Sequence, residues 1–376
     1  MPAPLVGPDF GSYQPDEVSW LLTDLSSLDL EGDIATRESD IQAGRAHYAE
    51  TLPIEYQPDP EYQSLFNQVL ASTAARLAHA VGSVTELVLA ERGTDIVLAS
   101  LARAGTPIGI LMRRWAGQLH GLDLPHYAVS IVRGRGIDRV ALDYLAVQHD
   151  PASVVFVDGW TGKGAIAKEL AAALAALAAA GGPVFSDDLA VLADPGRSVR
   201  TFGTRDDFLI ASACLNSTVS GLVSRTVLNP AYLGPGDFHG AKFYRELAAD
   251  DVSTVLLDAV SGQFSAVADA VMASRTELAR SDRRATFSGW AAVEEIRARY
   301  GIESVNFVKP GVGETTRVLL RRVPWKILVR TADHPDHAHL RLLAERRGAA
   351  VEVVPDLAYS CMGLVRRLSP ADTGEG

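Results

Sequence analysis

The chain has 376 residues, of which 47% are hydrophobic. This length and composition suit one large domain with a smaller one, and they exclude a chain that is disordered throughout. The net charge of −11 argues against a protein that coats nucleic acid over its whole surface, although one local basic face is compatible with it.

The chain has two cysteines, Cys214 and Cys361. Two cysteines cannot build a disulfide framework or a four-cysteine zinc site, so a reducing compartment is expected. The first residues lack the basic and apolar segments of a signal peptide, and the longest apolar run, 167–182, is too short to span a bilayer. We therefore expect a cytoplasmic protein without a membrane partner.

In the first half of the chain, apolar runs typical of buried strands alternate with apolar residues at helical spacing. Helices are expected at 15–30, 61–81, 106–115 and 165–180, and strands at 96–102, 126–132 and 154–158. Short apolar strands that alternate with helices favour a parallel sheet covered on both faces. The predicted fold class is therefore α/β.

The second half is less regular. We expect a strand at 189–192, helices at 213–227 and 256–278, and then a compact strand–helix–strand–helix–strand unit. The predicted domains are 1–280, with N-terminal segments that form a hood over the site, a helical linker at 281–300, and a small α/β sandwich at 301–370.

The segment Val154–Gly164, VVFVDGWTGKG, predicts a strand that ends in an anion-binding loop. A helix N-terminus offers unpaired N–H groups, and the glycines allow the backbone to approach an anion closely. Thr161 can donate a hydroxyl proton to a phosphate oxygen, and Lys163 adds a positive charge. Asp158 lies where α/β sheets place ligands, and its carboxylate can bind ribose hydroxyls or Mg²⁺.

Two other interpretations of this loop are a P-loop and a glycine-rich turn without any ligand. A P-loop needs a glycine five residues before Gly162 and a serine or threonine after Lys163, but the chain has Val157 and Gly164 there. The P-loop is therefore excluded. A glycine-rich turn without any ligand remains as the second interpretation.

Two upstream segments also favour anions. Arg103 precedes the backbone of Ala104, Gly105 and Thr106, which follows a strand and opens a helix. Arg133 and Arg135 lie on a glycine-rich loop after the next strand and can fold over a bound anion. The alternative for each arginine is a solvated surface charge.

Together these segments resemble the type I phosphoribosyltransferases, whose signature is an apolar strand, two acidic residues and a loop rich in threonine and glycine. The order of the three segments is that of the family's pyrophosphate loop, flexible loop and phosphoribosyl pyrophosphate loop. The match departs from the family at Gly159, which stands in place of the second acid.

The resemblance implies Mg²⁺-dependent transfer of a phosphoribosyl group from phosphoribosyl pyrophosphate to a base or base-like acceptor. In this resemblance Asp158 would bind the ribose hydroxyls and the metal. Arg133 or Arg135 would close over the substrate. The remaining binding residues would be, for the 5-phosphate, Thr161, Gly162, Lys163 and Gly164 and, for the pyrophosphate, Arg103, Ala104, Gly105 and Thr106.

More narrowly, the chain resembles the phosphoribosyltransferase-like proteins of tellurite-resistance and stress operons, through stretches that cover most of residues 10–170. That group also carries the label of a StiP-type cysteine protease. The alternative function is therefore a cysteine peptidase that uses Cys214 with His239 as its base. Against it, a lone cysteine is most often a small buried apolar residue.

The C-terminal unit resembles the RNA-binding domains of the L7Ae/Pelota type. Gly313, Glu314 and Arg317 match the turn through which that family contacts RNA, with Gly313 in place of an asparagine. The resemblance implies structured RNA as a partner, with Glu314 accepting from a guanine edge and Arg317 meeting a phosphate. The alternative for this unit is a docking domain that no longer binds RNA. A further alternative for the whole chain is a regulator that binds nucleotides or RNA without catalytic activity.

Overall fold

The computed structural model describes residues 1–32, 47, 49–55 and 60–365. Its centre is a sheet in which six strands run parallel, in the order β1-β6-β5-β8-β9-β10. These strands are β1 Ser19–Leu21, β5 Val97–Ala102, β6 His126–Val132, β8 Val154–Trp160, β9 Ala190–Ala193 and β10 Thr201–Thr204, and the short β7 Gly136–Ile137 pairs antiparallel with β6. The predicted α/β class with a parallel sheet is confirmed.

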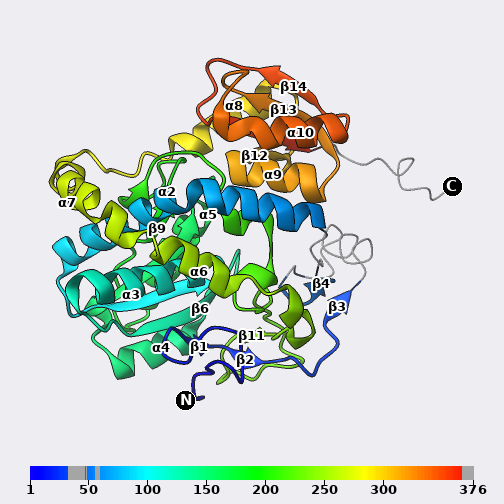
Figure 1. The fold of residues 1–376 in the computed structure, drawn as a ribbon. Coiled ribbons are helices and arrows are strands. Elements are labelled where there is room, and N and C mark those ends of the chain that lie inside the picture. The colour runs from blue at the N-terminus through cyan, green and yellow to red at the C-terminus, as the bar shows by residue number, and fades with distance from the viewer. Residues whose placement is uncertain (33–46, 48, 56–59, 366–376) are drawn as a thin grey trace.

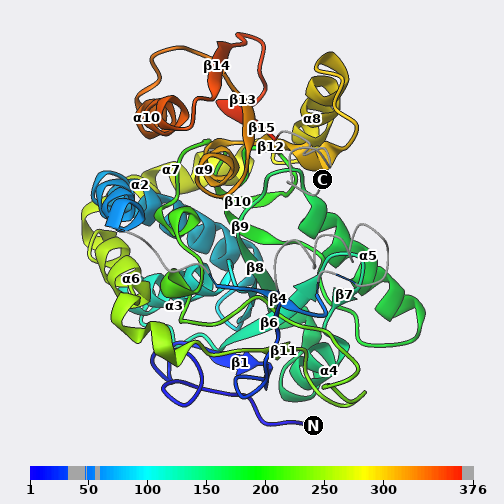
Figure 2. The same ribbon diagram turned by 90° about the vertical axis from the view of Figure 1, so that its right-hand side faces the viewer.

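Helices cover both faces of this sheet (Figures 1 and 2). One face packs against α2 Pro60–Arg92, α3 Thr106–His120, α6 Ser253–Ser261 and α7 Phe264–Arg280, and the other against α4 Arg139–Gln148 and α5 Ala165–Ala179. Within β5, Leu98 belongs to the first core, whereas Val97 and Ala99 belong to the second. The strand is apolar throughout because successive side chains point to opposite faces and both faces are covered.

Short strands and 3₁₀ turns complete the first domain. The strands are β2 Thr23–Asp24, β3 Glu31–Gly32, β4 Leu52–Pro53 and β11 Gly240–Ala241. The 3₁₀ turns in the described part of the chain are η1 Pro151–Ser153, η2 Ala211–Cys214, η3 Ser217–Val219, η4 Arg245–Asp250, η5 Val305–Phe307 and η6 Pro335–His337. Part of the expected hood falls outside the described residues.

The helix expected at 15–30 is wrong, because this segment forms the edge strand β1 and the short strand β2. The apolar residues that suggested a helix alternate between the two sides of the sheet. Trp20 packs in the core on one face and Leu21 in the core on the other. Tertiary pairing with β6 thus decides the conformation of this short segment.

The helix expected at 213–227 is also wrong. The segment contains only the end of η2 and η3, and Gly221 has a φ of +74°, which a continuous helix does not allow. The helix expected at 256–278 is instead two helices, α6 and α7, which meet at a bend of 60°. Among the described residues no single helix is long and apolar enough to cross a membrane, and only this bent pair meets both criteria together.

The C-terminal part is a second sheet with helices on both faces. Its strands run in the order β12-β15-β13-β14, with β12 Val308–Pro310, β13 Pro324–Val329, β14 Ala350–Val353 and β15 Cys361–Val365. One face packs against α8 Ser288–Arg299, and the other against α9 Val312–Arg321 and α10 Ala338–Arg346. This unit has one strand more than expected, the antiparallel β15.

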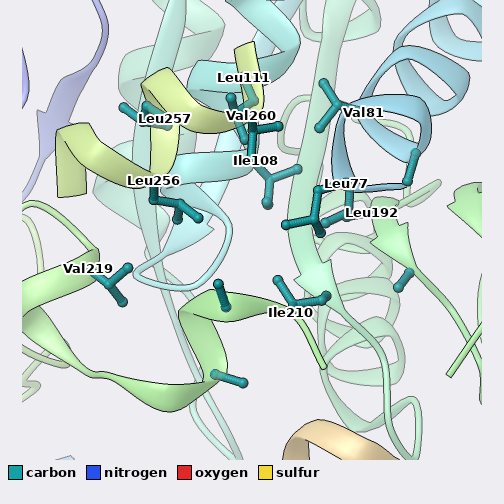
Figure 3. Packing of buried hydrophobic residues seen from close by; sticks show 14 of the residues in the cluster. Leu77, Val81, Ile108, Leu111, Leu192, Ile210, Val219, Leu256, Leu257 and Val260 are labelled. Atoms are coloured by element: carbon teal, nitrogen blue, oxygen red, sulfur yellow. The ribbon is translucent and has the colours of Figure 1, made fainter. Parts of the chain in front are cut away.

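The main apolar core lies between the parallel sheet and the helices α2, α3 and α6. Figure 3 shows Leu77 of α2, Ile108 of α3 and Leu256 of α6 with Ile210 and other buried side chains from the long loop after β10. Val312 and Leu319 of α9 belong to the same cluster. The apolar core therefore continues from the first domain into the C-terminal domain.

Replacing Gly82 of α2 by alanine should lower the free energy of unfolding by about 1–2 kcal/mol. A Cβ at Gly82 would lie 2.5 Å from the ring of Trp115, which is fully buried. At so short a distance the overpacking cost lies in the upper part of its usual range, about 2–3 kcal/mol, and the roughly 1 kcal/mol that alanine gains over glycine in a helix reduces it to the net loss given above. Urea unfolding measures the difference.

The matched control is Gly117→Ala in α3. Its Cβ would make an ordinary 3.6 Å contact with the carbonyl oxygen of Leu122, and the position is exposed. This variant should gain about 0.5–1 kcal/mol. The packing argument fails if Gly82→Ala stabilises the protein as Gly117→Ala does.

Candidate active site and nucleic-acid interface

The carboxyl ends of β5, β6, β8 and β9 meet at one edge of the parallel sheet, where α/β proteins place their ligands. The structure brings two of the predicted segments together at this edge. A Cβ on Gly159, near the end of β8, would lie only 3.2 Å from the carbonyl oxygen of Ala104, after β5. Gly105 is equally confined, because its Cβ would lie 2.4 Å from the carbonyl oxygen of Val157.

Asp158 is half-buried at this edge and accepts a hydrogen bond from the N–H of Gly159 at 2.7 Å. Burial raises the pKa of its carboxyl to about 7. Among the described residues, no group of three or more histidine, cysteine, aspartate or glutamate side chains is arranged to hold a metal. One half-buried carboxyl with a raised pKa is a poor fit for Mg²⁺, which prefers several oxygen ligands in an octahedral arrangement.

The donors of the glycine-rich loop make hydrogen bonds within the protein. The hydroxyl of Thr161 donates to the carboxylate of Asp194, and the ammonium of Lys163 donates to the carbonyl oxygen of Val305. Burial, together with the positive charges of Lys309 and Arg133, lowers the pKa of Lys163 to about 7. Gly164 has a φ of +75° and begins α5, as a turn from strand to helix requires.

The predicted arginines lie at the same edge, but two of them already have acidic neighbours. Arg103 donates to the carbonyl oxygen of Val223 at 3.0 Å and lies 3.6 Å from the carboxylate of Glu55. Arg135 is exposed and lies 3.8 Å from Glu50. The loop that carries Arg133 and Arg135 is held by the carboxylate of Glu169 in α5, which accepts from the N–H groups of Gly134 and Gly136.

The predicted RNA-contacting turn lies against the first domain. The N–H of Val312 donates to Asp207 at 2.8 Å. Arg317 donates from Nε to the carbonyl oxygen of Ala213 at 3.3 Å, and its guanidinium carbon lies 5.0 Å from the centre of the Trp160 ring. Glu314 forms an ion pair with Arg317 at 3.3 Å.

A small cavity lies where the turn and the loop meet. Its volume of about 20 Å³ is enough for roughly one water molecule. Its walls come from the loop after β8, the segment after β10 and the first turn of α9, among them Thr161, Gly162, Asp207, Ala213, Gly313 and Glu314. The structure thus brings the predicted anion loop and the predicted RNA turn to one place.

Both cysteines are fully buried. Cys361 lies in β15, and its thiol donates to the hydroxyl of Thr315 at 3.5 Å. Burial raises the pKa of Cys361 well above its ordinary value, and the charge of Asp207 raises it further. Cys214 is the last residue of η2 and follows Ala213, which lines the cavity.

His239, the expected partner of Cys214, bonds to other groups. Its Nδ1 lies 2.8 Å from the hydroxyl of Ser130, and its backbone N–H donates to Asp138 at 2.6 Å. Burial lowers the pKa of His239, so its ring is neutral at pH 7. The pairing of Cys214 with His239 stays a prediction.

Sequence reasoning missed two buried carboxylates that organise this region. Asp194 follows β9 and accepts from the N–H groups of Ser198 at 2.9 Å and Val199 at 3.1 Å, as well as from Arg205. Its place after an apolar strand is the same signal that identified Asp158. Asp207 follows β10 by a few residues, and the sequence carries no comparable signal for it.

A model of the Pelota RNA-binding domain matches residues 287–367. The match contains the sheet β12-β15-β13-β14 and the helices α8, α9 and α10. It therefore supports the expected Pelota resemblance of the C-terminal unit, and with it a link to RNA.

The larger part of the chain, residues 11–261, matches a family model described as the tellurite-like stress resistance cysteine protease StiP. A protein of Acinetobacter baylyi named cysteine protease StiP is 34% identical over 374 residues, which cover 95% of this chain and 94% of that relative. These matches overturn the expected transfer from phosphoribosyl pyrophosphate and favour the alternative. The chain belongs to the StiP family of tellurite-like stress resistance cysteine proteases.

Proposed function

We propose that this chain is a hydrolase that cleaves peptide bonds with a cysteine nucleophile. The observation that carries the proposal is the relative named cysteine protease StiP, which matches nearly the whole chain. The chain has only two cysteines, so the nucleophile is Cys214 or Cys361. The choice between them follows from their positions.

Cys214 fits the role better than Cys361. The protease family model spans residues 11–261 and therefore contains Cys214, whereas Cys361 lies within the Pelota match. Cys361 is fixed in the C-terminal sheet, and burial keeps its thiol protonated, which suppresses its reactivity. Cys214 lies at the end of a short 3₁₀ turn beside the cavity between the domains.

A cysteine nucleophile needs a neutral base that takes its proton. His239 supplies a neutral imidazole, and Asp138 lies beside it. Because Nδ1 of His239 faces Ser130 and the thiol of Cys214 is fully buried, the segment that carries Cys214 must move before the two side chains can cooperate on a substrate. We therefore propose a conformational step that precedes hydrolysis.

Replacing Cys214 by alanine should reduce hydrolysis of unfolded casein by roughly 10³-fold or more, because removal of a covalent nucleophile leaves only background catalysis. The matched control is Cys361→Ala, which should retain hydrolysis. Circular dichroism and urea unfolding establish that both variants fold. Equal hydrolysis by the Cys214→Ala variant and the unchanged protein would remove Cys214 from the mechanism.

A second candidate function, RNA binding by the C-terminal domain, is favoured by the Pelota match. Glu314 is its most specific test, because a carboxylate that accepts from a base edge contributes about 1–3 kcal/mol of discrimination. Glu314→Ala should weaken binding of a labelled RNA hairpin that contains an internal bulge, measured by fluorescence anisotropy.

The control, Glu345→Ala, removes the same charge from an exposed position on α10. Loss of a negative charge alone should strengthen RNA binding slightly, so the two variants should change the affinity in opposite directions. If both strengthen binding equally, Glu314 makes no contact with the RNA.

A further inference from the structure

The first domain packs against the turn through which the C-terminal domain is expected to contact RNA. Within the turn, a Cβ on Gly313 would lie 3.5 Å from the Cβ of Ala213. Arg317 bonds to the backbone of the same Ala213 and stacks over Trp160. The segment that leads to Cys214 and the end of β8 therefore cover part of the side chains and backbone that would face RNA.

Further hydrogen bonds hold the C-terminal domain in this position. The buried carboxylate of Asp207 accepts from the N–H of Val312 at 2.8 Å, and from the N–H and the hydroxyl of Ser360 at 3.0 and 2.8 Å. The hydroxyl of Tyr359 donates to the carbonyl oxygen of Gly162 at 2.7 Å. In α2, the hydroxyl of Tyr62 donates to the carbonyl oxygen of Leu320 at 2.6 Å.

Apolar contacts support the same position. Phe208 and Ile210, which precede Cys214, share one buried cluster with Val312, Leu319 and Leu320 of α9. Because burial of such side chains is favourable, the closed arrangement is the stable form of the chain without a ligand. A ligand that binds the turn must contribute enough binding free energy to offset the loss of this contact.

We propose that RNA and the first domain compete for this turn, so that RNA binds the form in which the C-terminal domain has moved away. The same movement frees the segment Ala211–Cys214 and uncovers the edge of the parallel sheet. RNA would thereby expose the thiol of Cys214. The inference rests on the proposed function for the identity of the partner and for the role of that thiol.

The proposal has a quantitative consequence, because linkage between two equilibria is reciprocal. A change that weakens closure by a given factor raises the apparent affinity for RNA by up to the same factor. A change that locks closure removes RNA binding. Of the residues expected to contact RNA, these changes alter Gly313 alone.

A disulfide between cysteines introduced by Ala213→Cys and Gly313→Cys would hold the protein in the closed arrangement. The background carries Cys214→Ala and Cys361→Ala, so that only this one pair of cysteines is present. The 3.5 Å separation of the two Cβ positions suits a disulfide. Anisotropy of the bulged RNA hairpin should show at least about tenfold weaker binding to the oxidised than to the reduced protein. Equal binding by the two forms would place the RNA on another surface and overturn the proposal.

The opposite test loosens closure. Tyr359→Phe removes one hydrogen bond to the loop, and Asp207→Asn turns an amide donor toward the donors on Val312 and Ser360. In a Cys361→Ala background, each variant should bind the hairpin about fivefold more tightly and react faster with iodoacetamide at Cys214. Tyr300→Phe is the control, because the hydrogen bond that its hydroxyl donates to Glu352 lies within the C-terminal domain.

The outcomes separate this inference from the proposed function. Faster alkylation of Cys214 in the presence of RNA, without hydrolysis of casein, would support the conformational coupling and contradict the protease. Hydrolysis that depends on Cys214, with RNA affinity and alkylation unchanged in both loosened variants, would support the protease and overturn the coupling. Absence of RNA binding in every reduced or loosened variant would also overturn it.

Discussion

One buried carboxylate, that of Asp207, joins the two domains. It accepts hydrogen bonds from the backbone at the start of α9 and from Ser360 at the start of β15. A buried charge is costly unless such donors satisfy it, so the C-terminal domain and the loop after β10 stabilise each other. Asp207 also lines the cavity together with Ala213 and with Gly313 and Glu314 of the RNA-contacting turn.

The same docking explains why a loop with the composition of an anion site makes its hydrogen bonds to protein. Lys163 donates to the backbone of η5, and the hydroxyl of Tyr359 donates to the carbonyl oxygen of Gly162, both across the contact between the domains, whereas Thr161 donates to Asp194 within the first domain. A loop rich in glycine, threonine and lysine is equally suited to a phosphate and to a close protein partner, because both require small residues and available donors. Composition alone cannot separate these two uses.

The sequence predicts best those elements whose pattern is local and long. The strands β5, β6 and β8 and the helix α5 lie almost where their apolar runs place them. Prediction fails where tertiary contacts decide, as in β1, where Trp20 and Leu21 pack on opposite faces, and in the segment after Ala213, which Gly221 interrupts. The predicted phosphoribosyl transfer was wrong for a related reason. A resemblance between loops identifies the position of a site on a fold, whereas the chemistry depends on which side chains meet at that site.

The proposed nucleophile, Cys214, is fully buried and does not lie in an open cleft. Burial suppresses the reactivity of a thiol toward oxidants and peptides alike, so access to the thiol becomes the controlling step. In this chain, access to Cys214 depends on a segment that contacts the C-terminal domain through Ala213 and Ile210. Since that domain carries a turn of the RNA-binding type, the most direct way to couple activity to a cellular signal is to make closure and RNA binding mutually exclusive.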